Sequence, residues 1–301
     1  MKKRIIITGG TGQDGVILSK LLLKKKYVIF SLINKKKFHK IKNVNYIKIN
    51  LRNQKIVLKL IRKINPHAII HLAAKNYSRA NNYKVRDKHS YNENLKGAKN
   101  LIDSTIKINK KIKFIFAGSS LMFKKKEGIV DERSKLEPSC YYSKYKIEIH
   151  KYLIKIKKKF NLFATTAFFF NHDSKYRNSK FLFPRLAKLI KTNQIKEINK
   201  IYEHNIYGDF SHAEDICRGI ISLLNLKKSP DKIILSSNKL SGINKLIEYG
   251  LEKKKISFNF TLPKKKTVNL IGDNTLARKV LKWKPKLNHL LAFKEILEKQ
   301  I

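Results

Sequence analysis

The sequence predicts an α/β fold in which a doubly wound parallel sheet is joined by a smaller C-terminal domain. Three observations lead to this prediction. Short apolar runs alternate with stretches of helical periodicity, a glycine-rich turn separates the first run from the first helical stretch, and 301 residues suffice for such a domain with an appendage. Continuous apolar runs are typical of parallel strands that helices cover on both faces.

Six apolar runs are predicted to be strands. The first is followed by a helix in which Val16, Leu18, Leu21 and Leu22 recur at helical spacing. A further helix is expected to begin near Tyr142, ahead of the sixth run. The six runs are residues 4–8, 27–33, 46–51, 68–74, 113–120 and 162–170.

The chain is expected to divide at about residue 170. Residues 1–170 should form the sheet domain, to which residues 206–236 return. Residues 171–205 and 237–301 should form the smaller domain. We expect it to lie over the carboxyl ends of the strands, where open α/β sheets bind their ligands.

The formal net charge of +47 is by itself typical of proteins that bind nucleic acids. Only ten of the 68 basic residues are Arg, however, and the lysines are spread along the chain beside Ile and Asn. Specific nucleic-acid binding favours Arg gathered on one face. We attribute the charge to a drift in composition, since the codons of Lys, Ile and Asn are rich in adenine and thymine. We therefore expect no specific nucleic-acid partner.

Cysteine usage and hydropathy indicate a cytoplasmic protein. Cys140 and Cys217 match no disulfide framework and no metal-binding spacing. The N-terminal segment reaches glycines after three apolar residues, which is not the form of a signal peptide. No apolar run approaches the ~20 residues of a membrane span. We expect neither a metal ion nor a membrane partner.

Gly9, Gly12 and Gly15 lie in the turn between the first strand and the first helix. Glycines at such a place let backbone N–H groups approach a pyrophosphate at a helix N-terminus, where the helix dipole also attracts anions. The spacing is GxxGxxG, not the GxGxxG of many dehydrogenases. Glycines also serve in ordinary turns, but the position of this turn predicts a dinucleotide-binding site of Rossmann type.

The residues after the second strand bear on the choice of dinucleotide. A carboxylate there favours NAD, and basic residues favour the 2′-phosphate of NADP. The segment reads INKKK, residues 33–37, and contains no acid. We expect NADP, with contacts from Asn34 and Lys35, and keep NAD as the alternative.

The stretch SCYYSKYK, residues 139–146, contains one tyrosine and one lysine at the spacing of a catalytic pair. Tyr142 and Lys146 are four residues apart and would share a helix face. Tyr141 and Tyr145 have no lysine at that offset. In so basic a chain, the pair also fits a lysine-rich helix that happens to contain tyrosines.

Five segments occur in the order typical of one protein superfamily. They are TGGTGQDG from Thr8, the LAA of residues 72–74, AGSS from Ala117, Tyr142 with Lys146, and FNHDS from Phe170. With them the chain resembles the extended short-chain dehydrogenase/reductase superfamily, the NAD-dependent epimerases and dehydratases. GQDG, FNHDS, GDFSHAEDI from Gly208 and NLIGDNTLARKVLKWKPK from Asn269 are similar to the GDP-mannose 4,6-dehydratase family, over nearly the whole chain.

The resemblance implies a catalytic triad of Ser119, Tyr142 and Lys146. In the family, the tyrosine is the acid/base at the C4 hydroxyl of the sugar, and the serine hydrogen-bonds the reacting oxygen. The lysine holds the nicotinamide ribose. Its ammonium favours the phenolate of a tyrosine, which otherwise titrates near pH 10.

The family spacing also selects among the tyrosines. Lys146 stands at the family's distance before the NLF segment of residues 161–163. The alternative register, with Ser143 and Lys144 as the Ser-Lys pair, would put Cys140 at the tyrosine position. We therefore prefer Tyr142.

The resemblance further implies which residues bind cofactor and substrate. The cofactor contacts are expected to be Gly9, Gly12, Gln13, Asp14, Gly15, Asn34, Lys35, Leu72, Ala73, Ala74, Tyr142, Lys146 and His172. The substrate contacts are expected to be Asn171, Arg177 and Arg185, the arginines serving the diphosphate with help from lysines 264–266. His172 could also hydrogen-bond the sugar or act as an acid, and a plain structural role at a strand end is an equal alternative.

Two features depart from the family pattern. The carboxylate needed to remove the C5 proton is replaced by Leu121, which leaves Glu127 and Glu132 as nearby alternatives. Two arginines expected at the substrate phosphates are replaced, one by Gly208 and the other by Pro263 or Lys264.

Three functions follow from these residues. We expect a nucleotide-sugar 4,6-dehydratase of GDP-mannose type, which oxidises C4 with bound NADP and eliminates water across C5 and C6. The alternative is an epimerase or 4-keto reductase on the same scaffold, which needs no elimination acid. A noncatalytic NADP-binding or nucleic-acid-associated protein ranks last. The family implies a GDP-linked substrate and a homodimer or homotetramer.

Overall fold

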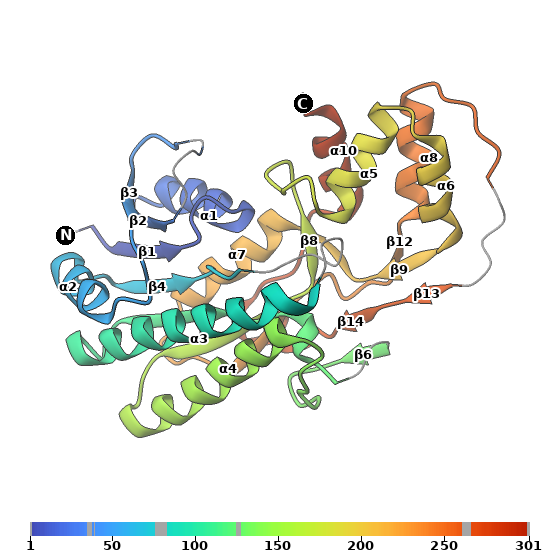
Figure 1. Ribbon diagram of the computed structural model, residues 1–301. Helices are drawn as coiled ribbons and strands as arrows, with labels where there is room; N and C mark the ends of the chain where they lie inside the picture. Colours follow the sequence, from blue (N-terminus) through green and yellow to red (C-terminus); the bar gives the residue numbers. More distant parts are fainter. Residues whose placement is uncertain are drawn as a thin grey trace.

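The computed structural model of the chain describes residues 2–34, 38, 40–75, 83–124, 128–260 and 266–299. The sequence positions Lys35, Glu127, Pro263 and Lys264 lie outside the described residues. Figure 1 shows a large sheet-and-helix part and a smaller, mostly helical part at the upper right. None of the described helices combines the length and apolarity that a membrane crossing needs.

Seven parallel strands form the main sheet, in the order β11-β7-β5-β4-β1-β2-β3. The order runs outward in both directions from the neighbours β1 and β4, which makes this pair the switch point of a doubly wound sheet. The predicted Rossmann-type α/β fold is therefore confirmed. The strands are β1 (Arg4–Thr8), β2 (Val28–Ile33), β3 (Val44–Lys48), β4 (Ala68–His71), β5 (Lys113–Ala117), β7 (Ala164–Phe169) and β11 (Lys232–Leu235).

The strands differ from the predicted runs mainly at their carboxyl ends. The run 68–74 leaves the ladder after His71, and the run 113–120 leaves it after Ala117. Strand β3 begins two residues earlier than predicted and ends at Lys48. Open α/β sheets bind their ligands outside the carboxyl ends of the strands. The residues that leave the ladder there no longer pair within the sheet, so their backbone groups can face a ligand. Strand β11, a lysine followed by three apolar residues, was not predicted as a strand and joins the sheet beside β7.

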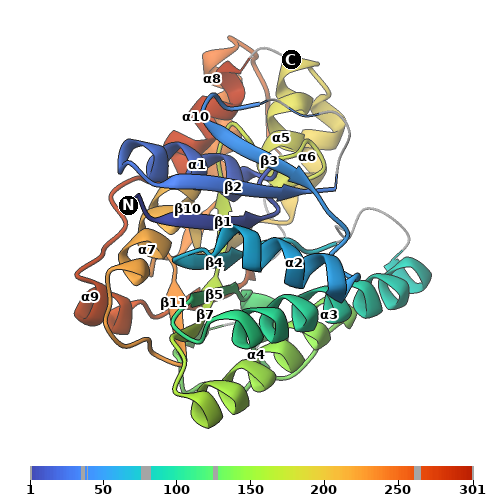
Figure 2. The ribbon, with the colours of Figure 1, turned by 90° about the vertical axis from the view of Figure 1, so that its left-hand side faces the viewer.

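Helices cover both faces of the sheet, as Figure 2 shows from the side. One core contains apolar residues of α1, α7 and α9, and the other contains those of α2, α3 and α4. The helices are α1 (Gln13–Lys24), α2 (Gln54–Ile64), α3 (Tyr83–Ile108), α4 (Tyr141–Phe160), α7 (Ala213–Leu224) and α9 (Thr275–Leu281). Burial on both faces explains why the strands read as continuous apolar runs.

Helix α4 has well-defined signals at both ends. Cys140 is the N-cap, its sulfur accepts from the Ser143 N–H, and the Ser143 hydroxyl accepts from the Cys140 N–H. The helix ends at Asn161, whose φ of 48° is left-handed. This capping box places Tyr142 in the first turn and Lys146 one turn later.

The smaller part packs four helices around a core that includes Phe183 and Phe293. They are α5 (Leu182–Lys191), α6 (Ile195–Glu203), α8 (Asn244–Lys253) and α10 (His289–Glu298). Short strand pairs join it to the sheet domain. They are β8 (Asn171–Asp173) with β10 (Phe210–His212), β9 (Ile206–Gly208) with β12 (Ser241–Gly242) and β13 (Thr267–Val268), and β6 (Gly128–Val130) with β14 (Leu270–Gly272).

The segment 206–236 is shared between the two parts. Its β9 lies in the small three-stranded sheet, whereas α7 packs on α1 and β11 extends the main sheet. Strand β8 begins directly after β7, so the polar segment that follows Phe170 starts as a buried strand. This brings the NHDS residues back toward the N-terminus of α1.

Candidate active site

The glycine turn is shaped for close backbone approach. Gly9 has a φ of +72°, and a Cβ there would lie 3.0 Å from the Ala73 nitrogen. A Cβ on Gly15 would lie 2.5 Å from the Cα of Gly10, so α1 packs directly on the turn. Gly12 is the N-cap of α1 and supplies no side-chain cap. The first N–H groups of the helix are therefore left for a ligand.

Three residues that the sequence reasoning missed support this turn. A Cβ on Gly10 would lie 1.6 Å from the Ser31 hydroxyl oxygen, so only glycine fits against β2. Thr8 and His71, at the ends of β1 and β4, are joined by a 2.7 Å hydrogen bond between Oγ1 and Nδ1. The signal for His71 was available, because it is a polar residue inside the apolar run 68–74.

The segment of residues 72–74 passes next to the glycine turn. The Ala73 N–H donates to the Thr8 Oγ1 at 3.0 Å, and all three residues are half-buried. Asn34, also a predicted cofactor contact, is exposed directly after β2. Both segments lie at the carboxyl ends of their strands, which is the edge where the glycine turn also lies.

Tyr142 and Lys146 are close together on α4. The Lys146 Nζ lies 5.1 Å from the centre of the Tyr142 ring. Lys146 is only 2% exposed, and burial lowers its pKa to about 7. The half-buried Tyr142 ring also lies edge-on to Tyr145, with centres 5.6 Å apart. The arrangement is that of an ammonium beside a phenol in a largely dry setting.

Lys146 also joins α4 to the end of β5. Its Nζ donates to the Ala117 carbonyl oxygen, and Ser119 follows two residues later. The Ser119 hydroxyl oxygen accepts from the Leu121 N–H at 3.3 Å and caps a single 3₁₀ turn, Ser120–Met122. Strand β5 thus carries the predicted serine to the neighbourhood of the tyrosine and lysine.

In the alternative register, the catalytic residues would be Cys140, Ser143 and Lys144, whose side chains have other partners. Cys140 and Ser143 form the capping box of α4. Lys144 is exposed, with its Nζ 5.4 Å from the centre of the Tyr91 ring. These contacts favour Tyr142 and Lys146 as the pair that faces the sheet edge.

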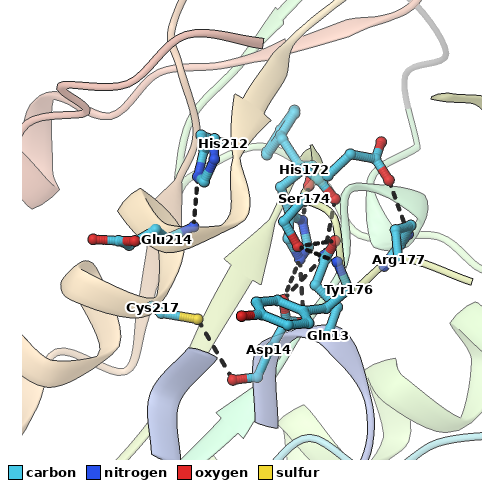
Figure 3. A network of polar contacts seen from close by, with 11 residues as sticks. Gln13, Asp14, His172, Ser174, Tyr176, Arg177, His212, Glu214 and Cys217 are labelled. Carbon is cyan, nitrogen blue, oxygen red and sulfur yellow. Dashed lines mark hydrogen bonds and ion pairs between the residues drawn. The ribbon is translucent and has the colours of Figure 1, made fainter. Parts of the chain in front are cut away.

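A second polar cluster, which we call the α1–β8 network, joins the start of α1 to β8 (Figure 3). The His172 Nε2 lies 3.1 Å from an Asp14 carboxylate oxygen, and its Nδ1 lies 2.6 Å from the Phe170 carbonyl oxygen. The Gln13 amide nitrogen donates to the His172 carbonyl oxygen at 3.1 Å, while its oxygen accepts from Ser174 at 3.0 Å. The network fastens α1 to β8.

Burial and the ion pair act in opposite directions on Asp14 and His172. For Asp14, burial is the largest single influence and opposes ionisation, but the charges of His172 and Arg177 and the hydrogen bonds of His172 and Gln13 together lower the pKa of the carboxyl. For His172, burial is again the largest single influence and opposes the charged ring, but the charge and hydrogen bond of Asp14 and the hydrogen bond to Phe170 together raise the pKa. The geometry therefore favours a charged pair between the helix and the strand.

The α1–β8 network bears on three predicted cofactor contacts. The side chains of Gln13, Asp14 and His172 are occupied with one another, and His172 has both ring nitrogens engaged. Any contact of Gln13 or Asp14 with a cofactor is left to their backbone N–H groups at the start of α1. Of the two roles considered for His172, the structural one is the better supported.

The predicted substrate residues lie on β8 and beyond it. Asn171 is exposed at the start of β8, and Arg185 is exposed on α5. The Arg177 Nε lies 3.1 Å from an Asp173 carboxylate oxygen, and its guanidinium carbon lies 3.6 Å from the centre of the Phe181 ring. Arg177 is thus held by an acid and an aromatic ring, a position from which it can bind an anion.

Position 121 itself carries no carboxylate, because it is occupied by a leucine. The Leu121 side chain is 37% exposed and can neither accept nor deliver a proton. Glu132 accepts from the Ile234 N–H of the edge strand β11 at 2.8 Å, and burial raises its pKa. One oxygen of Glu132 is therefore tied to the sheet edge, while Glu127 lies outside the described residues.

Comparison with known proteins extends the resemblance. A family profile described as GDP-mannose 4,6 dehydratase matches residues 6–299. The GDP-mannose 4,6 dehydratase 2 of Arabidopsis thaliana is 26% identical over 315 residues, covering 95% of this chain and 83% of the relative. The GDP-mannose 4,6 dehydratase of Dictyostelium discoideum is 23% identical over 349 residues, covering 100% of this chain and 96% of the relative.

Solved structures share the fold at low identity. A UDP-glucose 4-epimerase from Thermotoga maritima, with UDP-glucose, superposes with a TM-score of 0.81 at 18% identity, covering 98% of this chain and 97% of the other. The dTDP-glucose 4,6-dehydratase from Bacillus anthracis, in complex with NAD, gives a TM-score of 0.78 at 16% identity, covering 98% and 96%. Because the family profile spans nearly the whole chain, the protein belongs to the GDP-mannose 4,6-dehydratase family.

Proposed function

We propose that the protein oxidises C4 of a nucleotide sugar with a bound nicotinamide cofactor, and that 4,6-dehydration of GDP-mannose, in which the hydride goes on to C6, is the complete reaction. The observation that carries the proposal is the position of Lys146. Its ammonium nitrogen lies 5.1 Å from the Tyr142 ring centre and contacts the end of β5, two residues before Ser119. Membership of the GDP-mannose 4,6-dehydratase family supports the complete reaction.

The residues at the sheet edge fit a dinucleotide. Any side chain at Gly9 or Gly15 would fill the space where α1 meets the turn, and the first turn of α1 has no side-chain cap. The pyrophosphate would be held there, with Leu72, Ala73 and Ala74 beside it. A bound nicotinamide would supply the hydride acceptor for C4 and the hydride donor for C6 in the dehydration, or for C4 in epimerisation. The absence of an acid in residues 33–37 supports NADP over NAD.

The chain's own residues handle the proton. The Tyr142 phenolate accepts the proton of the C4 hydroxyl as C4 is oxidised. In the dehydration C4 stays a ketone and this proton is balanced by the one that leaves with the C6 hydroxyl as water, whereas in epimerisation or 4-keto reduction the phenol gives its proton to the C4 oxygen. The Lys146 ammonium favours the phenolate by its charge, which acts strongly because the site is dry. Ser119 donates to the reacting oxygen and fixes its position. Each role follows from the family motif and is supported by the placement of the side chain.

Lys146 makes the proposed reaction sensitive to alkaline pH. Burial lowers its pKa to about 7, so its ammonium is present below that pH and is lost above it in the cofactor-free protein. A bound anionic cofactor and a neighbouring phenolate favour the ammonium and extend the active range upward. The substrate contacts are proposed to be Asn171, Arg177 and Arg185, with the two arginines binding the diphosphate. The protein is proposed to be a cytoplasmic homodimer or homotetramer.

A second function, nucleotide-sugar epimerisation or 4-keto reduction, is favoured by the residue at position 121. These reactions need Ser119, Tyr142 and Lys146 but no base for the C5 proton. Leu121 offers no such base, and Glu132 is bound to the edge strand. The two functions share the C4 step and differ in the elimination.

Incubation with GDP-mannose and catalytic NADP separates them. A 4-keto-6-deoxy sugar formed without net consumption of NADPH supports the dehydratase. Stoichiometric oxidation of NADPH by a nucleotide 4-keto sugar, with no product from GDP-mannose, supports the reductase, and epimerised substrate supports the epimerase. No turnover of either sugar class, with no binding of NADPH or NADH, would overturn the proposal.

The variant Leu121→Glu tests the missing acid directly. If the wild type performs only the C4 step, a carboxylate at position 121 should allow water elimination from GDP-mannose, detected as 4-keto-6-deoxy product. Leu121→Gln is the matched control, because it has the same shape but cannot take a proton. Equal product from both variants would mean that position 121 is not the place of the base.

A further inference from the structure

His71 lies at the switch point of the main sheet and has no part in the reaction proposed above. It is the last residue of β4, it is paired in register with Thr8 of β1, and it is 2% exposed. Ligands of doubly wound sheets bind where the strand order reverses, which here is between β1 and β4. A buried imidazole at this place therefore merits a functional explanation.

One side of the His71 ring is tied to the glycine turn. Its Nδ1 lies 2.7 Å from the Thr8 Oγ1, and the same oxygen accepts from the Ala73 N–H at 3.0 Å. Gly9 follows Thr8 and approaches Ala73 so closely that a Cβ would lie 3.0 Å from the Ala73 nitrogen. Through Thr8, His71 fixes the spacing between the turn and the segment of residues 72–74.

The ring face of His71 supports the lysine. It stacks on Phe116 with ring centres 5.7 Å apart and an interplanar angle of 24°. The Phe116 ring centre lies 4.9 Å from the Lys146 Nζ, and Lys146 donates to the carbonyl of the next residue, Ala117. His71 thus backs the aromatic ring against which the ammonium rests.

The imidazole is neutral. Burial, and then the charge of Lys146, lower the pKa of His71 to about 3. Its Nε2 is buried without a hydrogen-bond partner in the described part of the chain. A neutral ring can lie beside an ammonium without repelling it, which a charged one could not.

We propose that His71 is a positioning residue that holds the cofactor-lining turn through Thr8 and the Lys146 ammonium through Phe116. The inference rests on the proposed cofactor and lysine roles and adds one residue to them. A single side chain at the switch point then keeps the dinucleotide and the proton-transfer pair in register.

A second buried histidine provides a matched control. His150 on α4 is 3% exposed, its Nδ1 lies 2.9 Å from the Thr166 Oγ1, and its ring meets Phe168 with centres 5.7 Å apart. Burial lowers its pKa to about 4. It has the same kinds of contact as His71 but touches neither the glycine turn nor Lys146 through them.

Two substitutions of His71 test its two contacts separately. His71→Phe keeps a ring against Phe116 but loses the hydrogen bond to Thr8. His71→Asn keeps a polar group near Thr8 but loses the ring. The full-length variants, with His150→Phe and His150→Asn, are titrated with NADPH from pH 6 to 9 by cofactor fluorescence, and their melting temperatures are measured.

His71→Phe should weaken NADPH binding about tenfold at every pH, because a buried hydroxyl loses its partner and the turn loosens. His71→Asn should leave the affinity at pH 6 within about twofold. The affinity for NADPH should fall as the pH rises and Lys146 loses its charge. In His71→Asn this fall should occur about one pH unit higher than in the wild type, because water admitted beside Phe116 solvates the Lys146 ammonium. The titratable side chains that face Lys146 in the described chain are His71, Tyr142 and Tyr145.

The His150 variants should lose comparable melting temperature and keep the wild-type affinity and pH dependence. If the His71 and His150 variants behave alike, His71 is only a core residue and the inference is wrong. If the His71 variants fail to fold, Thr8→Val tests the same hydrogen bond. It should reproduce the tenfold loss of NADPH affinity, and an unchanged affinity would refute the proposed role of the His71–Thr8 contact. A wild type that binds neither NADPH nor NADH would instead refute the proposed function, and this inference with it.

Discussion

The two polar regions beside the glycine turn differ in how completely their groups are partnered. In the α1–β8 network, both ring nitrogens of His172 and both ends of the Gln13 amide have partners. Around Lys146, the Tyr145 hydroxyl and the His71 Nε2 are buried without hydrogen-bond partners in the described residues. A closed network holds two elements together, whereas open groups are able to receive a ligand or water.

The difference separates residues that share the same family motifs. Gln13, Asp14 and His172 occur in the segments that most resemble the GDP-mannose 4,6-dehydratase family, yet their side chains join α1 to β8. Lys146 occurs in a helix full of lysines, yet it is buried beside Tyr142. A motif thus shows which residues matter, and the partners of each side chain indicate what it does.

The largest expected effect comes from the reaction centre. Tyr142→Phe removes the group that exchanges a proton with the C4 hydroxyl, and turnover should fall by about 10³-fold, within the usual range for a lost acid/base. The free energy of unfolding and the affinity for NADPH should change little. Turnover with GDP-mannose or a nucleotide 4-keto sugar is measured beside a denaturation curve.

Tyr141→Phe is the matched control, because Tyr141 is exposed at the same helix end and has no lysine four residues later. Its turnover should equal that of the wild type. If Tyr141→Phe were the inactive variant, the assignment of the tyrosine would be wrong and the comparison between the two regions would lose its basis.

The second effect concerns stability and tests the α1–β8 network. Asp14→Ala leaves His172 buried without its carboxylate and should lower the free energy of unfolding by about 2–4 kcal/mol. The charged pair contributes fully between pH 3.8, the ordinary value for Asp, and pH 6.5, the ordinary value for His. The loss should therefore be greatest in that window and shrink as the pH rises through the raised pKa of His172.

An exposed pair serves as the reference for Asp14. Glu214 and Arg218 form an i,i+4 ion pair on the surface of α7, and Glu214→Ala should change stability by less than about 0.5 kcal/mol. The turnover of the folded fraction of Asp14→Ala should stay near that of the wild type. A large loss of turnover in that fraction would show that the network acts in the reaction as well as in the fold.

The third effect is a substitution that should raise the free energy of unfolding rather than lower it. Lys146→Met should abolish turnover but stabilise the cofactor-free protein by about 1–3 kcal/mol at pH 6, because a buried ammonium is costly. The pKa of Lys146 is lowered from 10.5 to about 7, so the penalty is complete below pH 7 and falls to zero by pH 10.5. Denaturation at pH 6 and pH 10 checks this, and an equal gain at both would contradict it.

The sheet could be predicted from the sequence because apolar runs and glycines reflect local requirements. The ends of the strands could not be predicted, because Leu72 to Ala74 are as apolar as β4 before them. Only the folded sheet shows that these residues leave the hydrogen-bonded ladder after His71. The partners of Asp14 also could not be predicted, since His172 lies far away in the chain and meets it only through β8. The spacing of Tyr142 and Lys146 was local and therefore readable.

The smallest expected effect concerns Arg177, which borders both regions. Its guanidinium is paired with Asp173 and stacked on Phe181, so the structure alone would make it a fold residue. If it also binds the sugar diphosphate, Arg177→Gln should raise KM about tenfold and leave kcat unchanged, because the contact is the same in substrate and transition state. Arg177→Lys should recover only part of the affinity, since an ammonium cannot make the paired hydrogen bonds of a guanidinium. An unchanged KM in both variants, with lowered stability, would assign Arg177 to the fold and leave Arg185 as the diphosphate contact.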